Sequence, residues 1–207
     1  GAVWSGGGSI GMTDATTIGN PSQAIASSII NLAAGQTFDD QGSGGPAGTG
    51  RNISQGIFNN AGTYTKSAGD NFTYISATFN NSGTLNANAG TVRLAGGGSS
   101  SGAVSIGSGA TLQFESAAYE VSGTLSNAGT LQLQSGTVTF TAPMSYSGSG
   151  VVNLAGGTLR AQGNGFNPVA LNLSGGTLSG GGAVTVGTLN WTAGTMGEYE
   201  ASNFGGT

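Results

Sequence analysis

The chain has 207 residues, of which 42 are glycine and only 6% are charged, and its formal net charge is −4. Cysteine and histidine are absent, which excludes disulfides, thiolate nucleophiles and the usual zinc and iron sites. The chain has only 4 basic residues, which disfavours binding to nucleic acid or anionic lipid through charge, and no apolar run approaches the ~20 residues that span a bilayer.

Residues 1–56 repeat poorly, and we expect them to form irregular N-terminal coils or a cap. Ala24 to Ala34 is the one stretch that fits a short helix, although residues 28–32 also fit a strand. Because Gly1 is not methionine and no basic-then-apolar leader is visible, we expect a processed product or an excised fragment.

A repeated unit begins near residue 57. Phe58-Asn59-Asn60-Ala61-Gly62-Thr63-Tyr64 is almost repeated at residues 79–85 and again at 125–131, with a shorter echo at 187–195. The interval is about 20 residues, loosely kept, which lies in the range of solenoid repeats. In each unit glycine permits a turn with φ > 0, and the following Thr-Leu or Thr-Val opens a strand. We expect Asn60, Asn81 and Asn127 to occupy equivalent turn positions.

Alternation of apolar and polar residues is clear at 111–115, 131–134, 137–141, 169–173 and 184–186. In a strand, alternation sends one set of side chains to each face. The predicted core therefore includes Leu112, Phe114, Leu131, Leu133, Val138, Phe140, Leu171, Leu173, Val184 and Val186. Near-identity of successive units favours a solenoid over a sandwich or barrel, because each coil then lies on a copy of itself. The predicted fold is all-β, a parallel β-helix (β-solenoid) with coils of about 20 residues, over 57–207 in an array that continues; its right-handed sense comes from the resemblance described next.

The F-N-N-A/S-G-T unit with its G-T-L/V strand start resembles the β-strand repeats of very large secreted bacterial surface proteins, over about residues 57–197. These include filamentous-haemagglutinin-like and autotransporter adhesin passengers. The resemblance implies an extracellular right-handed β-helix that projects from a cell, adheres, or builds matrix or fibre.

Carboxylates are the candidate catalytic groups, because β-helices also host polysaccharide lyases and hydrolases. Glu198 and Glu200 would share a face of an extended strand, and a close carboxylate pair is what glycoside cleavage needs. Asp39 and Asp40 would point to opposite faces of a strand, or share a calcium ion in a loop. We interpret all the acids as solvated surface charges, and no catalytic residue is assigned.

No metal or cofactor site is assigned either, because the Gly-Gly units lack the Asp of the calcium-binding nonapeptide. Trp4, Tyr119, Tyr146, Trp191 and Tyr199 are candidates for stacking on sugars, although Trp191 better fits a core or terminal position. Threonine at every second position of 137–141 fits an ice-binding face, but one strand is not a face.

The sequence thus predicts an extracellular, structural or adhesive rod of a bacterial cell surface without a catalytic site. Its expected partners are copies of itself, in rods or filaments, and a glycan or other cell-surface ligand. The alternatives are a carbohydrate-active β-helix enzyme, either lyase or hydrolase, and an ice-binding solenoid.

Overall fold

The computed structural model describes residues 3–4, 9–12, 29–41, 51–53, 56–115, 117–163 and 165–197. The described residues contain no helix, and their strands pair in parallel as a β-solenoid of about 7 turns with about 20 residues per turn. The predicted fold class is confirmed as an all-β parallel solenoid, whereas the right-handed sense of the coil, which the resemblance implies, stays a prediction. No helix in the described part of the chain could span a bilayer.

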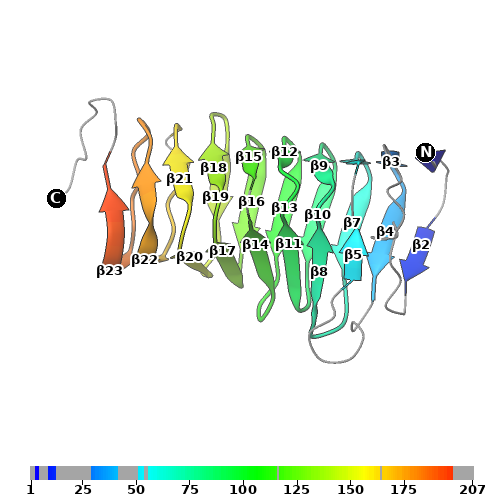
Figure 1. The fold of residues 1–207 in the computed structure, drawn as a ribbon, viewed down its shortest axis with the longest axis horizontal. Coiled ribbons are helices and arrows are strands. Elements are labelled where there is room, and N and C mark those ends of the chain that lie inside the picture. The colour runs from blue at the N-terminus through cyan, green and yellow to red at the C-terminus, as the bar shows by residue number, and fades with distance from the viewer. Residues whose placement is uncertain are drawn as a thin grey trace.

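Each turn of the solenoid passes through three strand positions in the same order, which define three faces of the rod (Figure 1). Face 1 contains β1 (Val3–Trp4), β3 (Ile29–Leu32), β6 (Ile57–Asn60), β9 (Thr78–Asn81), β12 (Gly98–Ser100), β15 (Ala118–Val121), β18 (Thr137–Phe140) and β21 (Thr158–Ala161). Face 2 contains β2 (Ser9–Met12), β4 (Thr37–Asp40), β7 (Thr63–Lys66), β10 (Thr84–Ala87), β13 (Ala103–Ile106), β16 (Thr124–Asn127) and β19 (Ser145–Ser147). Face 3 contains β5 (Arg51–Ile53), β8 (Phe72–Ile75), β11 (Thr91–Leu94), β14 (Thr111–Phe114), β17 (Thr130–Leu133) and β20 (Val151–Leu154).

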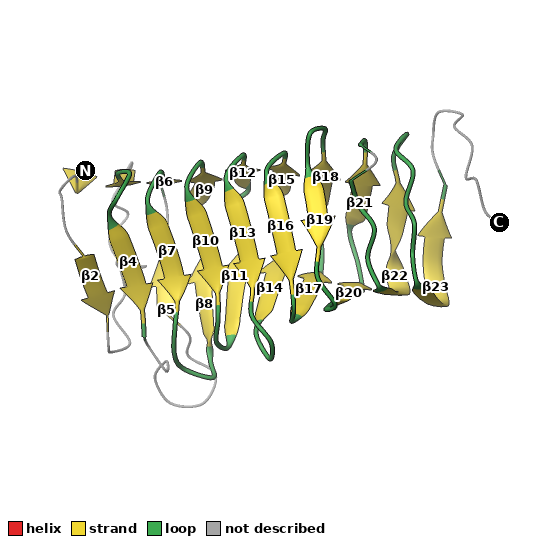
Figure 2. Ribbon diagram, turned by 180° about the vertical axis from the view of Figure 1, so that it is seen from behind, coloured by secondary structure: helices red, strands yellow, loops and turns green. Residues whose placement is uncertain are grey.

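The last two strands are longer and connect two faces. β22 (Ala170–Ser179) pairs with β20 through its first half and with β21 through its second half, and β23 (Thr188–Met196) pairs along β22. On face 2, which lies toward the viewer in Figure 2, the described residues form no strand after β19. An isolated bridge between Phe166 and Val184 takes its place.

Alternation within each four-residue strand produces the core, because inward side chains are buried and outward side chains are partly exposed. Of the predicted core residues, those buried are Leu112, Phe114, Leu131, Leu133, Val138, Phe140, Leu171 and Leu173. The prediction was wrong in degree for Val184 and Val186, which are only partly buried against the core. Both follow the irregular stretch of face 2, where no regular strand holds their register.

The three asparagines predicted to be equivalent are buried at strand ends, but only two share a place in the coil. Asn60 and Asn81 are in register on face 1, whereas Asn127 ends β16 on face 2. The repeated unit is therefore a strand–corner–strand segment that is used at two corners. The division at residue 56 stays a prediction, although β3 and β4 pair in register with β6 and β7. Of the stretch that also fitted a helix, residues 29–32 form strand β3.

Candidate functional site

The carboxylates of Asp39, Asp40, Glu115 and Glu120 face different surroundings, and each has its own contacts. Asp39 and Asp40 point to opposite faces of β4, as the sequence predicted. Outward-facing Asp39 accepts hydrogen bonds from the hydroxyl of Ser67 and the amide of Gln41, both at 2.5 Å. Glu120 on face 1 accepts one from Thr141. Glu198 and Glu200 lie outside the described residues.

Asp40 contradicts the interpretation of every acid as a surface charge. Its side chain is fully buried inside the coil, where the hydroxyls of Tyr64 (3.2 Å) and Thr73 donate to its Oδ2. Lys66, in register with Asp40 on the next strand, is also fully buried, and its ammonium donates to the carbonyl of Ala68 at 3.1 Å. Buried charges need such polar partners, so this cluster is structural and lies inside the rod.

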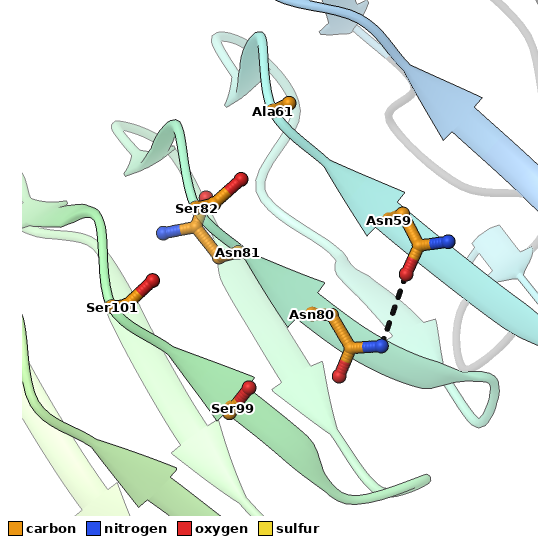
Figure 3. A pocket seen from close by; sticks show the side chains of 7 residues that line it. All are labelled: Asn59, Ala61, Asn80, Asn81, Ser82, Ser99 and Ser101. Carbon is orange, nitrogen blue, oxygen red and sulfur yellow. Dashed lines mark hydrogen bonds between the residues drawn. The ribbon is translucent and has the colours of Figure 1, made fainter.

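A hollow of about 260 Å³ on face 1 is the candidate binding site. Most of its lining belongs to two short files of outward-pointing residues, one at in-register strand positions and one at the first corner residue, and buried Asn81 lies beneath them. We call it the Asn–Ser groove, and Figure 3 shows its lining: Asn59, Ala61, Asn80, Asn81, Ser82, Ser99 and Ser101. None of these side chains is charged. The groove crosses β6, β9 and β12, because the register places Asn59, Asn80 and Ser99 side by side.

A ladder of amides forms one wall of the groove. Asn59 donates through Nδ2 to Oδ1 of Asn31 at 2.9 Å, and Asn80 donates in the same way to Asn59 at 3.0 Å. The ladder ends at Asn80 because the next coil has Ser99 at this position. Oδ1 of Asn80 receives no hydrogen bond from the described residues, and it points away from Asn59 (Figure 3).

A second, buried ladder holds the strands beneath the groove. Asn60 donates to Oδ1 of Asn81 at 2.7 Å, and Asn81 donates to the hydroxyl of Ser100 at 2.9 Å. Both asparagines also bond a backbone carbonyl of the following coil, that of Thr84 or Ala103. Stacked amides of this kind join consecutive parallel strands through side chains as well as backbone. These hydrogen bonds therefore hold the strands under the groove in register.

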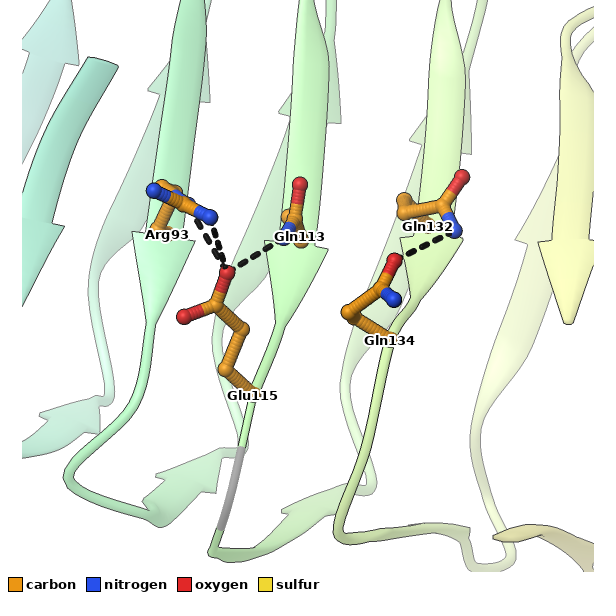
Figure 4. A network of polar contacts seen from close by, with 5 residues as sticks. All are labelled: Arg93, Gln113, Glu115, Gln132 and Gln134. Carbon is orange, nitrogen blue, oxygen red and sulfur yellow. Dashed lines mark hydrogen bonds and ion pairs between the residues drawn. The ribbon is translucent and has the colours of Figure 1, made fainter. Parts of the chain in front are cut away.

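Face 3 has a different polar cluster around Arg93 (Figure 4). Its Nε and Nη2 atoms lie 2.8 and 2.6 Å from Oε1 of Glu115, and Gln113 donates to the same oxygen. The guanidinium lies 4.7 Å from the ring centroid of Phe72 and 5.9 Å from that of Tyr74. Because the cation, the carboxylate and the nearer ring already contact one another, this cluster joins three coils and offers little to a ligand.

The sequence did not single out Phe72 and Tyr74, and the aromatics that it did single out lie elsewhere. Tyr119 and Tyr146 are buried, and burial raises the pKa of both hydroxyls, with a hydrogen bond from Asn127 opposing the rise at Tyr146. Trp191 is 52% exposed on β23, the last described strand, so the core position that the sequence offered is wrong and the terminal one fits. The side chain of Trp4 and all of Tyr199 lie outside the described residues.

Threonines are in register across four coils of face 1, in a file that the sequence did not reveal: Thr137, Thr158, Thr177 and Thr195. The neighbouring outward file carries Thr139, Arg160 and Ser179 in turn. An ice-binding face needs two regular threonine files, and among the described strands of face 1 only β18 has threonine at both outward positions. On face 2, β7 also has both, with Thr63 and Thr65, but its neighbours β4 and β10 do not. This arrangement does not favour the ice-binding alternative.

No family model, no curated protein and no solved structure matches the chain.

Proposed function

We propose that the protein is a structural and adhesive rod of an extracellular surface, and that it works without a catalytic site. The observation that carries this proposal is the Asn–Ser groove on an otherwise weakly charged rod. The solenoid places uncharged amides and hydroxyls in register over consecutive coils. Such a surface suits repeated, shape-dependent contacts better than chemistry at one point.

The resemblance of the F-N-N-A/S-G-T units to repeats of large secreted bacterial surface proteins supports the same function. The β-solenoid that this resemblance implies is the fold of the chain. Secretion, a bacterial cell surface and self-association into filaments are parts of the proposal. The low content of basic residues supports a partner other than nucleic acid.

The carbohydrate-active alternative requires carboxylates that converge on a substrate. In the described residues Asp39 lies on face 2, Glu115 follows β14 on face 3, and Glu120 lies on face 1, so these three do not converge. The pair Glu198 and Glu200 is therefore the pair to test.

Small-angle scattering and electron microscopy test the rod. We expect an elongated particle at low concentration and longer rods or filaments at high concentration. Compact particles at every concentration would contradict the proposal.

Polysaccharide cleavage assays test the absence of catalysis. We expect neutral and acidic polysaccharides to remain intact with the wild type. Cleavage that disappears in the Glu198→Gln, Glu200→Gln double variant would establish the enzyme alternative instead.

A further inference from the structure

We propose that the Asn–Ser groove binds a neutral, linear polysaccharide that lies along the axis of the rod. This inference rests on the adhesive part of the proposed function and names its ligand class.

The free polar groups of the groove determine the ligand chemistry. Oδ1 of Asn80 is an acceptor without a donor from the described residues, and the hydroxyls of Ser82, Ser99 and Ser101 make no side-chain hydrogen bond there. A serine hydroxyl both donates and accepts, as does each hydroxyl of a sugar. Uncharged donors and acceptors spread over a shallow surface therefore match a polyhydroxylated ligand.

Charge around the groove selects among such ligands. The lining is uncharged, and exposed Glu120 is in register with Ser99 on the neighbouring strand at one rim. A carboxylate there repels a polymer of uronic acids or sulfated sugars, and no cation of the lining compensates. The groove thus favours neutral sugars over anionic ones.

An apolar contact lies on the same face. Ile57 is 38% exposed and points outward from β6, two residues before Asn59. The hydrogens of a pyranose ring form an apolar surface that packs on such a side chain. A sugar with one edge on Ile57 would have its hydroxyls directed toward the amides of Asn59 and Asn80.

The repeat of the solenoid fixes the direction of the ligand. Neighbouring parallel strands are about 4.8 Å apart, so equivalent side chains of β6, β9 and β12 recur at that spacing along the rod. One sugar of an extended β-linked chain advances by a similar length. Consecutive sugars would therefore meet equivalent positions on consecutive coils, and affinity should grow with chain length until the three coils are covered.

Isothermal titration with cello-, xylo- and chito-oligosaccharides of increasing length tests this site. We expect at least one series to bind, with a Kd that falls with length, and the Asn80→Ala variant to raise that Kd about tenfold by removing the free acceptor. Ser99→Tyr, which fills the groove, should abolish binding.

Asn172→Ala is the matched control. Asn172 donates to Oδ1 of its in-register neighbour Asn153 at 2.8 Å on face 3, so this variant also removes one outward amide–amide bond but leaves the groove intact. We expect its Kd to equal that of the wild type. Circular dichroism of each variant checks that the solenoid is retained.

Three results would overturn the inference. They are absence of binding by all three series, stronger binding of oligouronates than of neutral chains, and equal weakening of binding by Asn80→Ala and Asn172→Ala. Rod formation is measured separately and does not depend on the groove. Rods that bind no sugar would refute this inference alone, whereas sugar binding by a particle that never forms rods would refute the proposed assembly.

Discussion

At the scale of single residues, the buried asparagines show how the coils are joined. Asn81 is only 2% exposed, accepts from Asn60, and donates to Ser100 and to the carbonyl of Ala103. Asn60 begins the ladder, and its Oδ1 has no partner because the coil below presents Leu32 in register. Asn127 bonds the carbonyl of Val151 in the same way at a different corner.

We predict that Asn81→Ala lowers the free energy of unfolding by about 2–4 kcal/mol, because it removes three hydrogen bonds and leaves buried groups unpaired. The comparison variant is Asn86→Ala, whose amide makes one outward hydrogen bond to Thr65 at 3.1 Å and which should cost less than about 1 kcal/mol. Urea unfolding measures both. Equal losses would show that the buried ladder contributes nothing beyond an ordinary surface bond.

We predict that Tyr119 makes the fold sensitive to high pH. Burial raises the pKa of its hydroxyl above the ordinary value of 10.0, so above pH 10 the unfolded state loses a proton that the folded state keeps. Stability is then constant below pH 10 and falls above it by at most about 1.4 kcal/mol per pH unit. Tyr119→Phe removes this contribution and leaves that of Tyr146, whose hydroxyl pKa is also raised by burial.

The same substitution costs about 1 kcal/mol at pH 7, because the hydroxyl donates to the carbonyl of Ser99 at 3.2 Å. Denaturant unfolding at pH 7 and pH 11 separates the two effects. The variant should be the less stable protein at pH 7 and should lose less stability on going to pH 11. Identical losses in both proteins would contradict the assignment.

Sequence reasoning could not place Asp40 and Lys66. Charged residues are usually exposed, and their burial here depends on hydroxyls that the fold brings from other strands. The alternation rule did predict that Asp39 and Asp40 point in opposite directions; it could not tell which of the two points inward.

At the scale of strands and corners, the sequence predicted the strands well because period-two alternation is a local property. It made no prediction for β8, where the aromatic Phe72 and Tyr74 point outward and Thr73 with Ile75 point inward. Hydrophobicity favours the opposite direction. Two contacts stabilise the observed direction of β8. Thr73 donates a hydrogen bond to buried Asp40, and the guanidinium of Arg93 packs over the ring of Phe72.

Glycine at the corners was interpreted as a source of positive φ, and the structure corrects this in part. Gly90 and Gly157 do have positive φ, at 54° and 67°. At the corner between faces 1 and 2, however, glycine is required by close contact between coils. A Cβ on Gly83 would lie 2.1 Å from the carbonyl oxygen of Gly62, and one on Gly102 would lie 2.1 Å from that of Gly83.

We therefore predict that Gly102→Ala destabilises the fold by about 3 kcal/mol or more, since backbone of the preceding coil must move to admit the methyl group. Gly107→Ala is the matched variant, because its Cβ would come no closer than 3.3 Å to Asn88. That change requires Asn88 to shift by only a few tenths of an ångström, so it should change the free energy of unfolding by less than about 1 kcal/mol. Thermal unfolding compares them, and similar melting temperatures would show that the coils separate at this corner at little cost.

At the scale of the whole molecule, the repeated units allowed the solenoid fold to be predicted from the sequence. The number of faces of the solenoid could not be predicted in the same way. The unit at 58–64 and its copy at 79–85 both span the corner between faces 1 and 2, but the copy at 125–131 spans the corner between faces 2 and 3. Because the same repeated unit occurs at two different corners of the coil, the interval between its copies along the sequence is not constant. The Asn–Ser groove could not be predicted from the sequence either, because its residues come together only through the strand register of three coils.

The coil that contains β23 gives the last prediction, which concerns assembly. Leu189 and Trp191 are in register with Leu171 and Leu173, whose side chains are fully buried, yet they are 43% and 52% exposed. Within the described residues β23 pairs only with β22, so the backbone groups of its other edge can pair with another strand, and charge, the usual protection of such edges, is absent from β23. We expect light scattering to show an average mass that rises with protein concentration, because a second copy covers these side chains. Trp191→Lys should reduce the association, since lysine on an edge opposes pairing. Val169→Lys is the control, because Val169 is 53% exposed but precedes β22 rather than lying on β23. If both variants reduce the association equally, general apolar contact causes the association rather than the open edge of β23. A wild-type protein that stays monomeric at high concentration and low salt would rule out stacking through this end.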